Sequence, residues 1–539
     1  MRRPLAALGI AAAAAAVACV RQPESGRHLG AVDFTTSCAR PAERRFQEGL
    51  AYLHHTMYAE AERSFGAATA LDERCAMAQW GIAMAQFRPL WPGDPPEAAL
   101  GKASAALVKA RALAPPTKRE QAYVEAAAAY VHEWAVTDRP TRLAAWVAAH
   151  ERLHRDHPRD VDAAAFHALA LLASAPLDDP TFAAMMRAAE ILEPLRADSP
   201  DHPGVLHYLL LAHDNPLLAP HAQEVAAAYA RFVDELPEVG HATSHISIRL
   251  GRWGDSIRSN GAASAAARRL SVGDMAQSRY AHEQDYMIYS LLQGAWDTRA
   301  QAILRQLARS PRFEPDFASA YALAAAPARY HLERDDWEGA ARLDPPWPPD
   351  FPWERFPAAR AITLFARGIG AARTHDEAGA AAASEGLAQA RAELAGSDPY
   401  WASLVEAQRL AVAAALAFSR GRPDDALAGM RAAAELEDAV DRHPVSPGHV
   451  LPCRELLGDL LLELDRPAEA LVEFEASLAR APNRFRALYQ AGHAALEADE
   501  LDKGFDYLER LVRQAEDSRS DRPQIARARD ELRWGRGGR

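Results

Sequence analysis

The sequence carries none of the short motifs that mark common enzyme classes. A serine nucleophile elbow, a phosphate-binding Walker loop, a glycine-rich dinucleotide fingerprint, a CxxC pair and an EF-hand loop are all absent. Paired carboxylates in a plausible cleft are also missing, because the acidic residues are distributed along helix faces. The sequence therefore indicates no reaction, no catalytic residue and no required cofactor, and it favours a binding protein over an enzyme.

Alternating sequence rich in β-branched residues is also scarce, so strands should be nearly absent. The hydrophobic content of 49% is inflated by alanine, and 30 glycines and 36 prolines are spread along the 539 residues. This composition predicts an all-α protein with frequent helix ends. The chain is much longer than the ~250 to 300 residues at which a single core stops growing, so we expect several domains or an open stack of repeats.

A recurring helix-turn-helix pattern favours the stack of repeats. Small residues at fixed spacing let two helices approach closely, while an aromatic ring fills the gap between them, as in the tetratricopeptide unit of ~34 residues. The clearest copy consists of Gly458, Leu461, Ala470, Phe474, Ser477 and Pro482, and Gly492, Ala495, Gly504 and Leu508 repeat it one period later. The predicted fold is an all-α tetratricopeptide-repeat α-solenoid, a superhelix of antiparallel helix pairs.

The first residues have the features of an export signal. Two arginines precede an apolar run that is too short to span a membrane, and small residues at positions 16–18 lead directly to Cys19. Residues 1–18 are thus predicted to be a signal peptide, and Cys19 resembles the lipidated cysteine of a bacterial lipobox. The alternative is an ordinary secretory cleavage site with a chance cysteine. Val20 resembles the outer-membrane sorting pattern, so we expect a lipid-anchored envelope protein that faces the periplasm.

The charge of the chain restricts its partners. The formal net charge is −12, and removal of residues 1–18 takes away two positive charges. Such acidity argues against nucleic acid and anionic lipid as broad electrostatic partners. We therefore expect a protein or peptide partner, with the membrane contacted only through the N-terminal lipid.

Three cysteines remain after Cys19, in a compartment that permits disulfides. Cys38 precedes the first helix of the first repeat and Cys75 follows its second helix, so an antiparallel pair would bring both to the same end. We predict a disulfide between them, worth about 3 to 4 kcal/mol in the chain-entropy model. Cys453 has no obvious local base and is predicted to be a small packed residue.

The chain divides into segments by composition and repeat pattern. A segment with five prolines and two tryptophans, DPPWPPDFPW, cannot be helical, and it is either a bridge that packs aromatic rings between repeats or a recognition loop. The predicted segments are a signal peptide (1–18), a lipid-anchored tether with a short ordered start (19–37), N-terminal and central repeats (38–343), the Pro/Trp-rich bridge (344–357), C-terminal repeats (358–515), and a terminal helix with a frayed basic tail (516–539).

Several stretches resemble a family of large bacterial exported tetratricopeptide-repeat proteins of unassigned function. These are FTTSC, CAMAQWGIAMA, HPGVLHYLLLAHD, HATSHISIRLGRW, PARYHLERDDW, LEDAVDRHPVSPGHVLPCRELLGDLLLE and APNRFRALY. The resemblance spans about residues 33–515 and implies an exported all-helical superhelix. Leu211 departs from the pattern, because the family looks to carry a second histidine there, four residues after His207. Cys453 stands where alanine is usual.

The strongest candidate site lies in the stretch PEVGHATSHISIRLGRW. Repeat alignment places His241 and His245 on the concave face of a helix, four residues apart, a spacing that lets two imidazoles reach one metal ion. Helices one unit earlier and one unit later carry further polar residues. The predicted groove residues are His207, Tyr208, His241, His245, Arg249, His282, Asp285 and Tyr289. His241, His245, His207 and His282 are the candidate ligands for a divalent metal ion, and structural histidines that join repeats are the alternative.

Two further clusters receive structural interpretations. His150, His154 and His157 share one helix face and are expected to be solvated surface, and the adjacent pair His54 and His55 points to different faces. Around the loop of residues 443–452 lie acids and bases that we expect to form an ion-pair network holding the loop rather than a catalytic site. Its members are Glu437, Asp438, His443, Arg454 and Glu455.

The predicted function is binding of a peptide, a protein or a small polar ligand in the concave groove, since repeat stacks leave an extended curved surface. The main alternative is a metal-binding protein or a metal-dependent enzyme centred on the groove histidines. A purely structural envelope scaffold is the third class.

Overall fold

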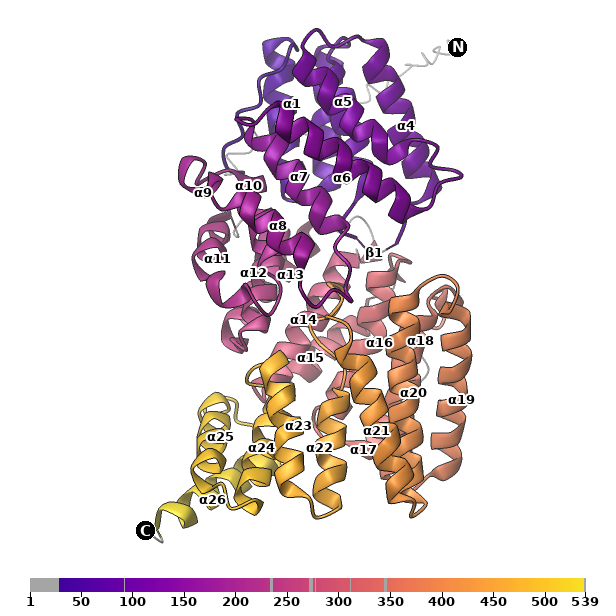
Figure 1. Cartoon of the computed structure of the whole chain (residues 1–539), viewed down its shortest axis with the longest axis vertical. Helices are drawn as coiled ribbons and strands as arrows, with labels where there is room; N and C mark the ends of the chain where they lie inside the picture. Colours follow the sequence, from indigo (N-terminus) through magenta and orange to yellow (C-terminus); the bar gives the residue numbers. More distant parts are fainter. Residues whose placement is uncertain are drawn as a thin grey trace, which may run out of the picture.

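The computed structural model describes residues 29–91, 93–232, 236–270, 275–276, 278–310, 312–343 and 347–537. The predicted signal peptide, the lipidation candidate Cys19 and the tether up to residue 28 therefore lie outside the described residues. Within the described residues the chain is an all-α solenoid of antiparallel helix pairs (Figure 1), as the sequence predicted.

Helices of the first half precede the candidate site. They are α1 (Arg40–His54), α2 (Tyr58–Leu71), α3 (Ala76–Phe87), α4 (Glu97–Ala112), α5 (Lys118–Val131), α6 (Arg139–Asp156), α7 (Val161–Ala173), α8 (Ala183–Leu192), α9 (Leu195–Asp198), α10 (Pro203–Ala212), η1 (Ala219–His221), α11 (Gln223–Tyr229) and η2 (Ala230–Phe232). Three helices, α12 (Pro237–Arg249), α13 (Trp253–Leu270) and α14 (Ser278–Gln293), then connect the two halves.

The second half continues the array to the C-terminus. Its helices are α15 (Asp297–Leu307), α16 (Phe317–Leu332), α17 (Trp337–Ala341), η3 (Trp353–Arg355), α18 (Pro357–Arg373), α19 (Glu377–Leu394), α20 (Pro399–Ser419), α21 (Pro423–Asp438), α22 (Cys453–Glu463), α23 (Pro467–Arg480), α24 (Phe485–Glu497), α25 (Leu501–Gln514) and α26 (Pro523–Gly537). Two two-residue strands, β1 (Met275–Ala276) and β2 (Arg312–Phe313), pair in parallel.

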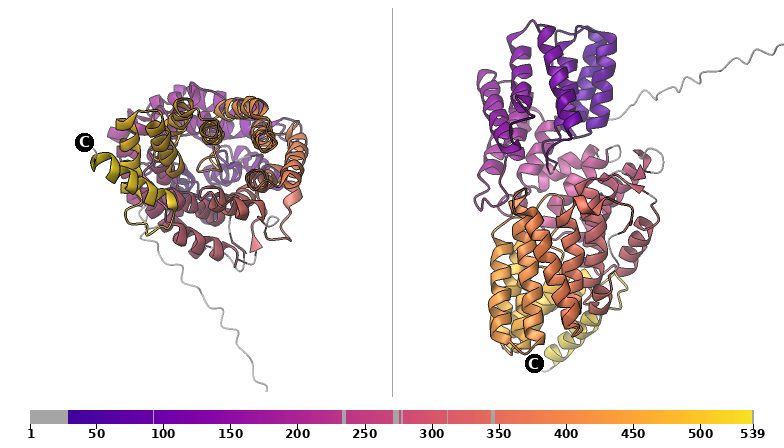
Figure 2. Two further views of the ribbon diagram at one scale, coloured as in Figure 1. Left: turned by 90° about the horizontal axis from the view of Figure 1, so that it is seen from below. Right: turned by 90° about the vertical axis from the view of Figure 1, so that its right-hand side faces the viewer.

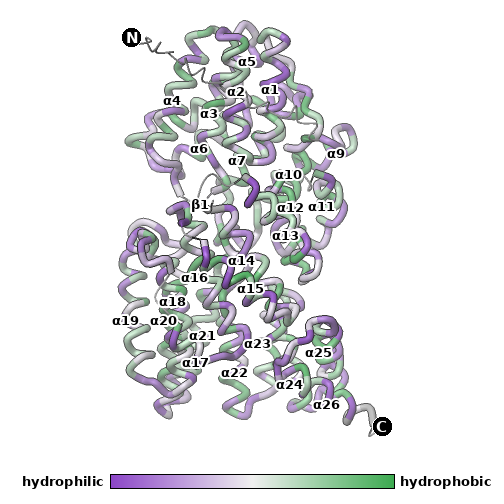
Figure 3. The backbone as a smooth tube through the Cα atoms, turned by 180° about the vertical axis from the view of Figure 1, so that it is seen from behind, coloured by the Kyte–Doolittle hydropathy of each residue, from purple (hydrophilic) through white to green (hydrophobic). Residues whose placement is uncertain are grey.

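Local sequence explains where many helices begin. The side chain of Thr117 accepts a hydrogen bond from the backbone N–H of Glu120, and Asp160 caps α7 in the same way. Proline occupies the first turn of α1, α12 and α18, where its missing N–H leaves no bond unmade. Hydrophobic and hydrophilic residues alternate along single helices (Figure 3), which leaves one face of each helix to pack.

Helix pairs pack by the repeat pattern that the sequence predicted. A Cβ atom added at Gly458 would lie 2.5 Å from Cζ of Phe474, so only glycine lets α22 and α23 approach with that ring between them. Gly49 and Phe65 make the same contact between α1 and α2, where the added Cβ would lie 2.8 Å from the ring. The same contact between a glycine and an aromatic ring therefore brings paired helices close together near both ends of the described chain.

Two large hydrophobic cores divide the described chain. One core runs from Leu29 to Ile246, and the other runs from Ala267 to Ala528. A small separate cluster of Ile248, Trp253, Tyr286 and Tyr289 lies between them. Figure 1 shows α12–α14 at this junction, and Figure 2 shows the helices wound around a common axis on either side of it. The candidate histidines thus lie where the two cores meet.

Two other sequence features occupy defined places. The predicted disulfide between Cys38 and Cys75 is present, and Cys453 is fully buried. In the Pro/Trp-rich segment, residues 344–346 lie outside the described residues, whereas Phe351, Trp353 and Phe356 pack into the second core. Phe356 lies 6.5 Å, ring to ring, from Phe317 of α16.

Helix α20 is long and apolar enough to span a membrane by length and composition, and it is the only such helix among the described residues. Here it packs between α19 and α21, and its Trp401 and Val405 belong to the second core. We therefore treat it as a core helix of the solenoid.

Candidate functional site

Three buried histidines converge on one point at the junction of the two cores. His241 and His245 lie one turn apart on α12, and His282 lies on the neighbouring α14. The Nε2 atom of His241 is 3.0 Å from Nε2 of His245 and 3.0 Å from Nε2 of His282. None of the three side chains is more than 7% exposed. The predicted convergence therefore occurs for these three residues.

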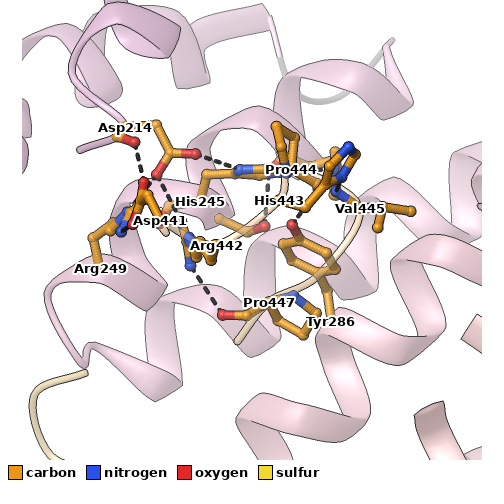
Figure 4. Close-up of polar contacts among 12 residues, drawn as sticks. Asp214, His245, Arg249, Tyr286, Asp441, Arg442, His443, Pro444, Val445 and Pro447 are labelled. Atoms are coloured by element: carbon orange, nitrogen blue, oxygen red, sulfur yellow. Dashed lines mark hydrogen bonds and ion pairs between the residues drawn. The ribbon is translucent and has the colours of Figure 1, made fainter. Parts of the chain in front are cut away.

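The protons on two of these rings are held on the far side, on Nδ1. Nδ1 of His245 lies 2.8 Å from Oδ2 of Asp214, so it donates to a carboxylate (Figure 4). Nδ1 of His241 lies 3.4 Å from Oδ1 of Asn260, whose amide nitrogen donates to the carbonyl of Ser256 and so leaves the oxygen to accept. The third ring, His282, has its Nδ1 buried beside the backbone of Val445 without a hydrogen bond of normal geometry.

This arrangement leaves lone pairs facing each other. A neutral imidazole carries one proton, and in His241 and His245 that proton is on Nδ1. Both Nε2 atoms therefore present lone pairs across 3.0 Å, and Nε2 of His282 approaches the same point. Two acceptors at hydrogen-bond distance repel each other unless a cation lies between them. Three Nε2 atoms that converge on one point, two of them on rings whose protons are held on Nδ1, are a donor set that suits a transition metal.

Burial keeps the three rings in the neutral form that binds a metal. Burial lowers the pKa of His241 well below its ordinary value, and His282 and His245 lower it further. The pKa of His282 is also well below its usual range, through burial and then His245. For His245, burial lowers the pKa against the opposing effect of Asp214. Metal ligands of this type must be deprotonated, so no pH change is needed to prepare the site at neutral pH.

A single carboxylate, Asp214, connects the cluster to the other half of the chain. Besides His245, it accepts from Nε of Arg249 at 2.9 Å and from Nη2 of Arg442 at 2.6 Å. Burial would raise its pKa, but Arg442, Arg249 and His245 outweigh that effect and hold the pKa well below the usual range. Asp214 is therefore a charged anchor for the ring of His245.

Residues 441–449 are here named the clasp, and Figure 4 shows part of this segment beside His245 and Tyr286. Asp441 accepts two hydrogen bonds from Arg249, at 2.8 and 2.5 Å. The hydroxyl of Tyr286 donates to the carbonyl of Pro444 at 2.6 Å, and its ring packs 4.7 to 4.9 Å from all three imidazoles. Arg329 donates to the carbonyl of Gly448 at 2.7 Å. The clasp thus covers the site from the C-terminal half.

A cavity of about 90 Å³ is lined by His241, His245 and His282. Its polar wall includes His207, Glu238 and Arg279. Thr56 comes from the turn after α1, and Tyr58 comes from the start of α2. Its apolar wall consists of Leu90, Trp91, Leu211, Ala242, Pro444 and Val445. Segments from both halves therefore enclose the space beside the histidines.

The sequence placed eight residues on an open concave groove, and the structure corrects this. None of the eight is more than 9% exposed, because the clasp and the segments around Thr56 and Trp91 fill the inner face at this point. His207, His241, His245 and His282 line the enclosed cavity. His207 is not a member of the three-nitrogen cluster.

The other predicted groove residues make structural contacts. The hydroxyl of Tyr208 lies 3.1 Å from Nδ1 of His54, Asp285 pairs with Arg329 at 3.1 Å, and Tyr289 bonds to Arg484 at 3.0 Å. Arg249 holds Asp214 and the clasp, as described above. Each of these polar groups has a protein partner, so they do not form one ligand-binding wall.

A second histidine cluster provides a contrast. Nε2 of His54 lies 2.8 Å from Oδ1 of Asp162, and Nε2 of His202 lies 3.3 Å from the same oxygen. Nδ1 of His202 accepts from the backbone N–H of Val205 and caps α10, so the proton of this ring is on Nε2, facing the carboxylate. Both rings here turn toward a carboxylate, so this cluster does not set lone pair against lone pair. We assign it a structural role.

The predicted loop network forms in a different arrangement. Arg454 pairs with Asp438 at 2.8 Å, whereas Glu455 on the same helix pairs with the buried Arg484. Nδ1 of His443 accepts from the backbone N–H of Val445. Arg442 and Arg329, which the sequence did not single out, make the contacts that hold the clasp. The acids and bases around the loop are thus structural, but they do not form one network.

Sequence reasoning missed Asp214, Asn260, Arg442 and Tyr286. Asp214 follows closely after His207 in the stretch HPGVLHYLLLAHD, yet no spacing rule links it to His245, which is 31 residues later. Asn260 lies on α13 at helical spacing from Ser256, so its position on a packed face was visible but its partner was not. These are contacts of tertiary structure.

Comparisons with known proteins identify only distant structural neighbours. No family model matches the sequence, and no curated protein matches it. Among solved structures, yeast Tom70 is 12% identical over 92% of this chain and 96% of that chain, with a TM-score of 0.29. The human IFIT1 dimer with PPP-AAAA is 14% identical over 87% and 89%, with a TM-score of 0.35. At these TM-scores we draw no conclusion from either protein.

The buried residue His150 on α6 predicts that the stability of the protein depends on pH. His150 was expected on the surface but is fully buried against Trp146, and neither ring nitrogen has a hydrogen-bond partner among the described residues. Burial lowers the pKa of His150 to about 3. The unfolded chain takes up a proton below about pH 6.5 whereas the folded chain does not, so stability falls as the pH falls. Between pH 7 and pH 5 we expect the free energy of unfolding to fall by about 2 kcal/mol less in His150→Leu than in the wild type.

Chemical denaturation at both pH values measures this difference. His132→Leu is the matched control, because the side chain of His132 is 79% exposed. Equal pH dependence in wild type and His150→Leu would contradict the assignment of His150 as a buried neutral ring.

Proposed function

We propose that this protein binds one divalent transition-metal ion through Nε2 of His241, His245 and His282. The observation that carries the proposal is the convergence of the three Nε2 atoms, with His241 and His245 holding their protons on Nδ1 through Asn260 and Asp214. Imidazole nitrogens suit zinc, copper, nickel and iron. The metal function, which the sequence ranked second, is now the leading proposal.

The contact between Asp214 and His245 supports the proposal. A ligating histidine usually donates its other ring N–H to a carboxylate or a carbonyl, which fixes the ring and raises its basicity. Asp214 does this for His245 and is itself held by Arg249 and Arg442. A structural role alone does not require two rings to turn their lone pairs toward each other.

Metal analysis of tag-free, purified protein tests this function. We expect about one zinc, copper, nickel or iron ion per chain, or the uptake of one equivalent of added zinc, and loss of that ion in His241→Ala plus His245→Ala. Asp214→Asn should weaken zinc binding by about 10 to 100-fold, because the carboxylate that orients His245 is lost.

The matched control is His154→Ala plus His157→Ala, which removes two histidines far from the cluster and should leave the metal content unchanged. A protein that takes up no metal, or a site variant that keeps its ion, would refute the proposal.

We further propose that the protein is exported and anchored through lipid on Cys19, in the outer membrane facing the periplasm. The Cys38–Cys75 disulfide supports an oxidising compartment. Intact mass of the protein from membranes should show loss of residues 1–18 and a lipid-sized increase on Cys19, absent in Cys19→Ala. A mature chain of unmodified mass in the soluble fraction would contradict this location.

Binding of a peptide or protein remains a second candidate, at a different place from the one the sequence indicated. A cleft of about 500 Å³ in the second half is lined by Trp337, Arg373, Asp459, Tyr489 and Gln490. Its mixture of aromatic and charged groups fits an extended peptide better than nucleic acid, given the acidic chain. Peptide-library selection should yield ligands whose binding is lost in Tyr489→Ala, and retention of binding by that variant would exclude this cleft.

A further inference from the structure

The cleft in the second half is walled in part by buried acceptors that lack a partner among the described residues. Glu333, at the end of α16, holds Oε1 against Nη2 of Arg484 at 2.7 Å, but its Oε2 accepts no hydrogen bond from the described chain. Gln524 on α26 donates to Asp335 through Nε2 at 2.8 Å, and its Oε1 is in the same position. Both side chains line the cleft. A buried acceptor without a donor is costly unless a bound molecule supplies the donor.

A donor in the cleft also lacks a partner in this part of the chain. Arg486 on α24 donates through Nε to Asp335 at 2.9 Å and through Nη2 to Asp459. Its Nη1 is buried and makes no hydrogen bond to a described residue, and Oε2 of Glu455 lies 3.8 Å from it. The side chain of Arg486 is 5% exposed. An occupant that satisfies these atoms must therefore both donate and accept hydrogen bonds.

The charges of the cleft favour a cationic occupant. Five carboxylates and three guanidinium groups line it, namely Glu333, Asp335, Asp459, Glu463 and Glu497, and Arg373, Arg486 and Arg527. Arg373 and Arg486 lie 5.4 and 5.8 Å from the ring centroid of Trp337, so an aromatic face of the cleft already accommodates cations. Burial raises the pKa of Glu333 in spite of Arg484, and a further cation at Oε2 would stabilise the charged form.

We propose that the cleft binds an extended peptide through one of its arginine or lysine side chains, whose cationic group donates to Oε2 of Glu333 and Oε1 of Gln524. A backbone carbonyl of the peptide accepts from Nη1 of Arg486, and a simple polyamine has no such acceptor. A volume of about 500 Å³ holds a long side chain with part of its backbone. This inference rests on the second candidate function, binding of a peptide in this cleft, and adds the chemistry that is recognised.

Calorimetric titration with two defined peptides tests the inference. One is an acetylated, amidated pentapeptide of four glycines around a central arginine, and the other carries citrulline, which has the shape of arginine without its charge. We expect saturable binding of the arginine peptide and binding weaker by about 10-fold or more for the citrulline peptide. Glu333→Gln should weaken binding of the arginine peptide by a similar factor. Gln524→Met should weaken it less, because a neutral acceptor is lost.

Gln389→Met, on the exposed surface of α19, is the matched control and should bind the arginine peptide as the wild type does. Unchanged binding in Gln524→Met, which removes no buried charge, would overturn the assigned contacts. Equal binding of the two peptides, or binding of neither, would overturn recognition of a cation. The peptide function itself fails only if library selection yields no ligand for the cleft. Free L-arginine that binds as tightly as the peptide would overturn a peptide as the occupant.

Discussion

The placement of two ring protons is the constraint on which the account of this site depends. Asp214 and Asn260 hold the protons of His245 and His241 on Nδ1, so both rings must turn their lone pairs toward the interior. In the second cluster, by contrast, His54 and His202 both face the carboxylate of Asp162. Burial and proximity are shared by the two clusters. Only in the cluster of His241, His245 and His282 do lone pairs face one another. For this reason histidines indicate an ion in that cluster and a structural contact in the other.

Asp214 also explains why the site lies at the junction of two cores. A buried carboxylate requires several charged partners, and here Arg249 comes from α12 while Arg442 comes from the clasp. Removal of either arginine would leave charge uncompensated in the interior. Orientation of the metal ligands and attachment of the clasp therefore depend on the same group, and an ion at the histidines would stabilise the junction as well as the site.

Much of the fold could be predicted from the sequence, because repeat packing is local. The glycine and aromatic spacing around Gly458 and Phe474 is satisfied within one helix pair, and Cys38 and Cys75 are brought together by the same geometry. His241 and His245 also lie on one helix, so the sequence shows their four-residue spacing directly. What could not be predicted involves contacts across about 190 residues, such as Arg249 with Asp441, which close the groove that a regular superhelix would leave open. The ring nitrogen that carries the proton in each site histidine depends on such long-range contacts, and the spacing of residues in the sequence does not reveal it.

X-ray absorption at the metal edge of the zinc-loaded, tag-free protein tests the central claim most directly. The account predicts a first shell with three imidazole nitrogens at about 2.0 to 2.1 Å and one further light ligand. The multiple-scattering signal of the imidazoles should fall when His282 is replaced by alanine. A first shell of oxygen atoms, or one that contains sulfur, would contradict the assignment of His241, His245 and His282 as the metal ligands.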